Sequence, residues 1–117
     1  MTYIKKYKKN LCFDLDGVIC LNTYGDYEKA KPINDAIKKI NYLYDNNYYI
    51  IIFTARYMGF AKGDLKKAIK KGYAFTQNQL NLWGLKYHKL LFGKPEYDII
   101  IDDKSYNYNQ DWIKNLE

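Results

Sequence analysis

Short apolar runs alternate along this chain with stretches in which apolar residues recur every three or four positions. Four of the apolar runs are typical of strands buried in a sheet, and these are residues 11–15, 48–53, 97–101 and, more weakly, 87–92. Helical spacing begins at Pro32, which suits a first helical turn, and continues to Asn46. The pattern therefore predicts strands that alternate with helices.

Two helices are expected between the second and third strands. The first begins near Leu65 and ends at Gly72, because glycine commonly follows the last turn of a helix. The second begins at Thr76, whose spacing to Gln79 is that of a capping box, and it stops at Gly84. Each helix thus has its own start and stop signals in the sequence.

A final short helix is expected to begin at Asn109 or Asp111, which gives the element order β-α-β-α-α-β-β-α. This alternation predicts an α/β fold with a doubly wound, mostly parallel sheet flanked by helices. The 117 residues fit a single domain that spans residues 1–117. In sheets of this kind, ligands bind beyond the carboxyl ends of the strands.

Polar residues follow three of the predicted strands. They are Asp14 and Asp16 after the first strand, Thr54, Ala55 and Arg56 after the second, and Asp102 and Asp103 after the last. Four carboxylates at one edge of a sheet repel one another unless a cation lies between them, and a set of oxygen donors suits Mg²⁺. Aspartates that only cap turns are the alternative, but here they recur after two separate strands. The sequence therefore predicts a magnesium site with the four aspartates as candidate ligands.

The spacing of Asp14 and Asp16 suits phosphoryl transfer. Residues two apart in an extended segment point the same way, so Asp14 can attack phosphorus while Asp16 transfers protons. Phosphate needs positive charge beside it, and Lys94, just past the third predicted strand, is the candidate. The residues that follow the second strand, Thr54, Ala55 and Arg56, are expected to bind the phosphate oxygens together with Lys94.

Four short motifs occur in order along the chain: Phe-Asp-Leu-Asp-Gly-Val at 13–18, Ile-Ile-Phe-Thr at 51–54, the lysine at 94, and Ile-Asp-Asp at 101–103. As a set, they resemble the motifs of the haloacid dehalogenase-like phosphatases over residues 11–103. The resemblance implies a Rossmann-like fold, Mg²⁺ as cofactor, Asp14 as nucleophile and Asp16 as general acid and base. It also implies that the metal is bound by Asp14, the backbone carbonyl of Asp16, and either Asp102 or Asp103.

This family usually carries a cap domain, but the segments between the motifs are filled here by predicted helices and strands, so a capless member is expected. Residues 53–56, 83–84, 87–88 and 93–95 further resemble small phosphatases encoded with enzymes of capsule and surface-polysaccharide biosynthesis. That resemblance implies a small phosphorylated metabolite as substrate, such as a sugar, polyol or amino-alcohol phosphate. A neighbouring subunit of a homo-oligomer could then serve as a lid.

Several other side chains near the motifs could be functional or structural. Arg56 could bind the substrate or anchor the loop in which it lies. Tyr24 or Tyr27 could contact the substrate or simply belong to a turn. His88 is expected to pack beside the helix of Trp83 rather than to act in catalysis, and Cys12 is expected to be a buried free thiol.

The chain carries a net charge of +6, from 19 basic and 13 acidic residues, which favours anionic partners. The lysines form no stripe interleaved with aromatic residues, so nucleic acid is not the expected partner. No apolar stretch reaches the roughly 20 residues of a membrane span, and we expect a cytoplasmic protein with no membrane association. Two rival functions stay open: a phosphatase for nucleic-acid ends or phosphoproteins, and a non-catalytic binding module with the same fold.

Overall fold

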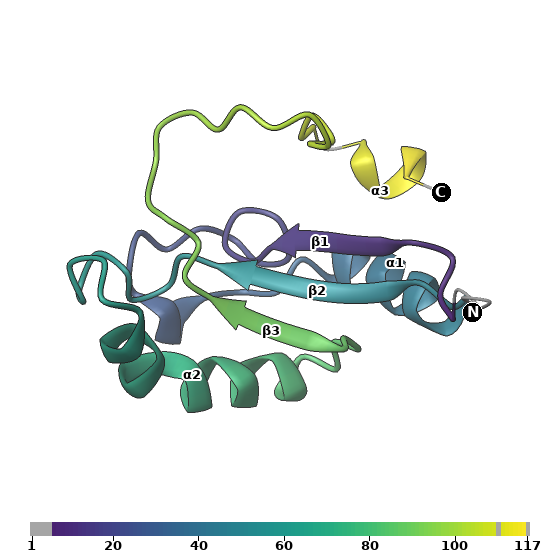
Figure 1. Ribbon diagram of the computed structural model, residues 1–117. Helices are drawn as coiled ribbons and strands as arrows, with labels where there is room; N and C mark the ends of the chain where they lie inside the picture. The colour runs from purple at the N-terminus through teal and green to yellow at the C-terminus, as the bar shows by residue number, and fades with distance from the viewer. Residues whose placement is uncertain (1–5, 110, 117) are drawn as a thin grey trace, which may run out of the picture.

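Three parallel strands form the central sheet of the computed structural model, which describes residues 6–109 and 111–116 (Figure 1). The strands β1 (Asn10–Asp14), β2 (Tyr49–Thr54) and β3 (Lys89–Phe92) lie in that order across the sheet. Their register places Phe13 beside Ile52 and Ile52 beside Leu90. The predicted α/β class, a parallel sheet flanked by helices, is confirmed.

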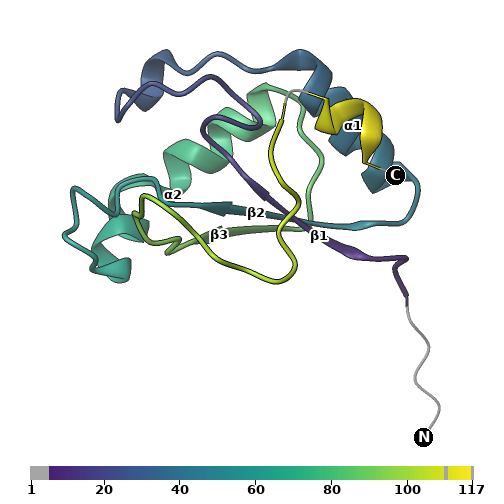
Figure 2. The same cartoon turned by 90° about the horizontal axis from the view of Figure 1, so that it is seen from above.

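The two crossover helices, α1 (Asn34–Asp45) and α2 (Leu65–Leu82), lie on the same side of the sheet (Figure 2). Both crossovers move one strand in the same direction, and right-handed crossovers of that kind place their helices on one face. The carboxyl ends of all three strands consequently meet at one edge of the sheet. No separate cap domain covers that edge in the described part of the chain.

The hydrophobic core lies between the sheet and these helices. Alternate strand residues face the helices and are buried, and they are Phe13, Ile50, Ile52, Leu90 and Phe92. The opposite face of the sheet is more open, and Leu91 on it is 39% exposed. Cys12 lies on this open face and is exposed, so the prediction of a buried thiol is wrong. The apolar run identified the strand but not which face is covered.

Helix α2 is one continuous helix, so the prediction of two helices separated near Gly72 is wrong. Gly72 lies in the interior of this helix. The residue is a glycine because the ring of Tyr57 packs directly against its Cα, where any Cβ would overlap the ring. The helix begins at Asp64, whose carboxylate accepts the backbone N–H of Lys67. Thr76 is buried in the interior of α2 and caps no helix.

The predicted strand at residues 97–101 is absent from this structure, which is a further correction. The segment is extended but unpaired, and Ile99 and Ile101 are 81% and 96% exposed. Figures 1 and 2 show the chain rising past the carboxyl ends of the strands and then running back beyond β1. A parallel strand needs a crossover of roughly a dozen residues or more, whereas four residues, 93–96, separate this segment from β3.

The short helix α3 (Trp112–Asn115) ends the described chain, and its N-cap residue is Asp111, one of the two predicted starts. The Trp112 ring is buried, and its centre lies 5.5 Å from that of Phe13. The imidazole of His88 stacks on the rings of Tyr44 in α1 and Tyr49 in β2.

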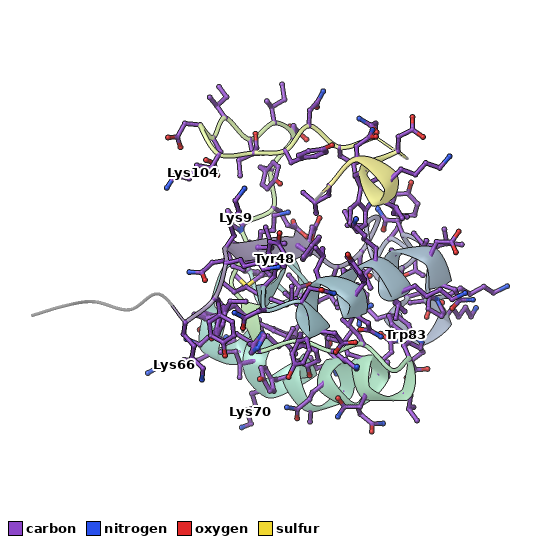
Figure 3. All side chains as sticks on the ribbon, turned by 90° about the vertical axis from the view of Figure 1, so that its right-hand side faces the viewer. Lys9, Tyr48, Lys66, Lys70, Trp83 and Lys104 are labelled. Atoms are coloured by element: carbon purple, nitrogen blue, oxygen red, sulfur yellow. The ribbon has the colours of Figure 1, made fainter. Side chains whose placement is uncertain are left out.

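The charged surface of α2 faces solvent. Lys66 and Lys70 lie on the outer side of this helix and point away from the sheet (Figure 3). Among the described residues, no helix is long and apolar enough to span a membrane.

Candidate active site

Asp14 and Lys94 form an ion pair at the carboxyl edge of the sheet. Lys94 Nζ lies 3.1 Å from Asp14 Oδ2, while Asp14 Oδ1 accepts the backbone N–H of Leu15 at 2.8 Å. The Lys94 backbone N–H donates to the Thr54 carbonyl at 3.2 Å, which fixes the lysine beside the end of β2. Lys94 and the Leu15 N–H thus orient the Asp14 carboxylate. The Asp14 side chain is 36% exposed, so a ligand can still reach it.

The Lys94 ammonium is stabilised in its charged form. Burial lowers its pKa, but hydrogen bonds to Tyr97 and Asp14 and the charge of Asp14 outweigh that effect, so the net pKa lies above the usual value. Lys94 therefore remains a cation at neutral pH. A cation fixed beside a carboxylate at a cavity can stabilise an anionic group that approaches that carboxylate.

The second motif aspartate, Asp16, is held by a buried arginine. Arg56 Nε and Nη2 donate to the two carboxylate oxygens of Asp16, each at 2.9 Å. Arg56 is 1% exposed. Burial lowers the pKa of Arg56, but the hydrogen bonds to Asp16 and the negative charge of Asp16 raise it by more. The net pKa lies above the usual value, so the guanidinium stays charged. Gly17 follows at φ +91°, where the chain turns sharply away from the strand.

Every N–H group of the Arg56 side chain has an acceptor. Besides Asp16, the guanidinium donates to Gln79 Oε1 at 2.7 Å, to Thr76 Oγ1 at 3.5 Å and to Cys20 Sγ at 3.8 Å. A guanidinium has five N–H groups, and these contacts use all of them. Of the two interpretations of Arg56, the structure favours the anchoring one, since no donor is left for a substrate phosphate.

The loop after the first motif is tied to the same cluster through Tyr27, the first residue of the short helix η1 (Tyr27–Lys29). The Tyr27 ring lies against the guanidinium of Arg56, 4.6 Å from its central carbon. Its backbone carbonyl accepts an N–H of Gln79 at 2.8 Å, and its hydroxyl accepts the Tyr57 backbone N–H at 3.5 Å. Tyr27 thus forms a fixed wall of the site.

A cavity of about 640 Å³ opens at this edge of the sheet and is lined by Asp14, Asp16, Ala55 and Arg56. Its remaining wall combines aromatic and charged side chains, namely Tyr24, Tyr27, Tyr57, Phe60, Lys71 and Glu96, together with Asn22 and two glycines. Glu96 lies close to Gly59, where an added Cβ would come within 2.6 Å of the carboxylate. The volume is that of a small-molecule site.

Thr54 and Ala55 take different positions at the end of β2. Ala55 lines the cavity, whereas Thr54 is fully buried and its hydroxyl accepts the backbone N–H of Arg56 at 3.1 Å. In this structure the Thr54 hydroxyl therefore braces the turn after β2.

The structure does not bring Asp102 and Asp103 to the other motif residues. Both are exposed and lie in the segment that follows residues 97–101, and Asp102 Oδ1 accepts the backbone N–H of Lys104 at 2.9 Å. In the described part of the chain, no three His, Cys, Asp or Glu side chains gather closely enough to hold a metal ion. The first three motifs therefore meet, and the fourth stands apart.

Cys20 lies beneath the site as an unreactive thiol. Burial, together with the charge of Asp16, raises the pKa of Cys20 to about 12, and its Sγ lies 3.4 Å from Asp16 Oδ1. A nucleophilic cysteine needs a lowered pKa, so the raised pKa of Cys20 disfavours thiol chemistry at this position.

No protein-family model matches this chain, and neither does any curated protein. The chain is similar to the crystal structure of a structural-genomics target from Vibrio cholerae, with a TM-score of 0.78 and 26% sequence identity. The similarity covers 91% of this chain and 94% of that chain. The whole architecture therefore recurs in that protein, for which no activity is named.

Sequence reasoning missed several residues of the cavity wall, among them Tyr57, Phe60, Lys71 and Glu96. Glu96 lies two positions after Lys94, so the rule that selected residues just after strand ends could have found it. Lys71 gave no such signal, because its neighbours are surface lysines on the same helix.

Proposed function

We propose that this protein is a phosphomonoester hydrolase of the haloacid dehalogenase-like type that works through a phospho-aspartate on Asp14. The observation that carries the proposal is the ion pair of Asp14 and Lys94, 3.1 Å apart, in which Asp14 also lines the cavity. A carboxylate is a competent nucleophile toward phosphorus, and a fixed ammonium offsets the charge of the phosphate that it attacks. An inert binding module has no need of this arrangement.

In the proposed reaction, a carboxylate oxygen of Asp14 attacks phosphorus and the bond to the ester oxygen breaks, which gives an acyl phosphate and an alcohol. Water then attacks the acyl phosphate, which releases inorganic phosphate and restores the carboxylate. Lys94 stays beside the transferred group in both steps.

Asp16 is the proposed acid and base. Both of its oxygens accept N–H groups from Arg56, which is the arrangement of an ionised carboxylate. In this arrangement Asp16 suits the second step, in which it takes a proton from the attacking water. In the first step the same group would deliver a proton to the leaving alcohol, and this requires one oxygen to turn away from Arg56.

Mg²⁺ is the proposed cofactor, but the described residues of one chain do not fit it. Asp14 is paired with Lys94 and Asp16 with Arg56, and among the described residues no third acidic side chain lies close enough to them to hold a metal ion. Mg²⁺ prefers six oxygen ligands and commonly takes one or two carboxylates plus phosphate oxygens and water. Neither of the two steps above depends on the ion.

The proposed substrate is a small phosphorylated metabolite, such as a sugar, polyol or amino-alcohol phosphate of surface-polysaccharide biosynthesis. A cavity of about 640 Å³ suits such a molecule. Its aromatic wall, with Tyr24, Tyr27 and Tyr57, can pack against C–H groups, while Glu96 and Lys71 can bind hydroxyl or amino groups.

The test is the release of inorganic phosphate from p-nitrophenyl phosphate and from a panel of phosphorylated metabolites, with Mg²⁺ and with a chelator. We expect metal-dependent release that is greatest for one small metabolite. No release from any compound above that of an Asp14→Asn variant would reject the proposal. Greater activity on phosphorylated oligonucleotides or phosphopeptides would instead support the rival substrate classes.

A further inference from the structure

Residues 97–101, here called the isoleucine segment, have a strand-like sequence but pair with no strand in the described part of the chain. Ile99, Ile100 and Ile101 are 81%, 52% and 96% exposed. Three consecutive isoleucines are typical of a strand buried on both faces, and their exposure is unusual for a folded protein. The segment ends directly at Asp102 and Asp103, the two carboxylates that the candidate site lacks.

Strand β1 offers a free edge for such a segment. In the described part of the chain, β1 is hydrogen-bonded to β2 on one side, and no strand pairs with its other side. An unpaired edge presents a row of backbone donors and acceptors to any extended chain. A strand parallel to β1 on this edge would end beside Asp14, at the cavity.

The isoleucine segment cannot reach that position within its own chain. The link from Phe92 to Tyr97 spans five residue steps, which cover about 18 Å at most. A strand parallel to β1 would have to begin at the amino end of the sheet, whereas the link begins at the carboxyl end of β3. The link would therefore have to run back along the length of five strand residues, about 17 Å. It would also have to cross from β3 to the far side of β1, which is three strand spacings or about 14 Å. The direct line is about 22 Å and runs through the sheet itself, so the path around the sheet is longer still.

An antiparallel arrangement is within reach of the same chain, but it does not complete the site. The segment would then start beside Asp14 and end beside Asn10, so Asp102 would lie at the opposite end of β1. Figures 1 and 2 show the chain running in this opposite direction, beyond β1 and unpaired, and Figure 3 shows Lys104 far out on this part of the molecule. Only a parallel strand can deliver both aspartates to the cavity.

We propose that two copies of this chain exchange their isoleucine segments, each of which pairs in parallel with the free edge of β1 in the other copy. A two-fold symmetric dimer pairs both free edges at once and removes part of the surface of both isoleucine segments from water. A second copy is favoured over a different protein as the partner, because this chain carries both the free edge of β1 and the unpaired strand sequence that could bind to it.

The exchange also completes the candidate site, and this part rests on the proposed function. In the register that sets Ile101 beside Asp14, the partner's Asp102 and Asp103 follow at the carboxyl edge of β1. Each cavity then holds carboxylates from two chains, which supplies the oxygen donors that one chain lacks. The active site would therefore exist only in the dimer.

The first experiment needs no activity. In the proposed register Ile99 lies beside Cys12, which is an exposed free thiol. Mild oxidation of the Ile99→Cys variant should give a disulfide-linked dimer on a non-reducing gel. The control variant Leu82→Cys, whose site is 79% exposed on α2, should give none, and neither should Ile99→Cys combined with Cys12→Ser. Light scattering on the wild-type chain should give about 28 kDa, twice its 14.0 kDa.

The second experiment tests the shared site by mixing two inactive variants. One chain carries Asp14→Asn, and the other carries Asp102→Asn with Asp103→Asn. After the two are unfolded and refolded together, half of the dimers are mixed, and each mixed dimer has one intact site. The mixture should therefore regain about a quarter of wild-type activity, whereas sites built within one chain would regain none.

A monomer in solution, or a disulfide that forms within one chain, would overturn the exchange. A dimer that gives no Cys12-dependent cross-link would overturn it as well. If the cross-link forms and the wild-type chain releases no phosphate from any compound, the exchange stands and the proposed function fails. If the wild-type chain is active but the mixture is not, the shared site is wrong.

Discussion

Arg56 donates to both carboxylate oxygens of Asp16 at 2.9 Å, from a side chain that is buried to all but 1% of its surface. The pair joins β1 to the turn after β2, and Gln79 and Tyr27 complete the cluster around it. A charge this deeply buried is tolerated because every donor is paired. The position of Asp16 therefore depends on a residue that never has to touch the substrate.

Replacement of Arg56 by alanine should destabilise the fold strongly. It leaves the charge of Asp16 and the amide of Gln79 without their partner, and removal of one member of a buried ion pair costs about 3–5 kcal/mol. We expect the free energy of unfolding in urea to fall by that amount.

The matched control is Lys86→Ala, which breaks an exposed ion pair with Asp45. Since both of these side chains are about half exposed, we expect a loss below about 1 kcal/mol. Equal losses for the two variants would show that the Arg56 cluster does not stabilise the fold.

Asp14→Asn should abolish catalysis and leave the fold intact. The amide cannot form the acyl phosphate, so the rate of phosphate release should fall by about a thousandfold or more. The partly exposed carboxylate contributes little to the core, so the melting temperature should stay within a few degrees of wild type. Asp35→Asn, an exposed aspartate on α1, is the control and should keep full activity. An active Asp14→Asn enzyme would rule out the covalent mechanism.

Gly72→Ala should destabilise the protein although alanine is the better helix former. Helix propensity alone would favour the change by about 1 kcal/mol. The new methyl group, however, overlaps the ring of Tyr57, and overpacking of this kind costs about 1–3 kcal/mol. Urea unfolding should show the net loss.

A double-mutant cycle separates these two effects. Tyr57 has φ +66°, so glycine is tolerated there and removes the ring. In the Tyr57→Gly background, Gly72→Ala should become neutral or stabilising. A loss of the same size in both backgrounds would mean that the ring contact is not the cause.

Cys20 should resist thiol reagents in the folded protein. Its pKa of about 12 leaves almost no thiolate at pH 8, and the side chain is fully buried, whereas Cys12 is exposed. A colorimetric thiol assay should count one reactive cysteine in the native chain and two in denaturant. Cys12→Ser should give none natively, and a native signal in that variant would contradict the burial of Cys20.

The raised pKa of Cys20 also predicts how stability depends on pH. The unfolded thiol ionises near pH 9, whereas the folded one holds its proton to about pH 12. Between these values the native state binds more protons, so the free energy of unfolding should fall as the pH rises. Cys20→Ala should lose this part of the slope, and an unchanged slope would contradict the shift.

Some features of the fold followed directly from local sequence. The Ile-rich run of β2 and the helical spacing of α1 were both read correctly, because periodicity records which positions are buried. The rule that carboxyl ends of parallel strands meet at one edge placed Asp14 and Lys94 at the same edge in advance. These inferences need only the spacing of residues within short segments.

Other features depended on partners that lie far away in the sequence. Gly72 was read as a helix end because nothing local signals the Tyr57 ring that occupies its missing side chain. Thr76 and Gln79 have the spacing of a capping box, yet they accept N–H groups from Arg56 in the middle of α2. The same polar residues serve either purpose, and only the packing of α2 against the site selects one.

The isoleucine segment shows most clearly the difference between what local sequence determines and what the tertiary structure decides. Its sequence predicts that residues 97–101 form a buried strand that ends in two aspartates, because exposure of three isoleucines to water is unfavourable. Whether such a strand forms, and in which chain, is set by distance, since four linking residues cannot span the sheet. The sequence by itself determined the positions of β1, β2 and β3 and selected Asp14, Asp16 and Lys94 as candidate site residues. Only the tertiary structure decided which of these groups can meet within one chain.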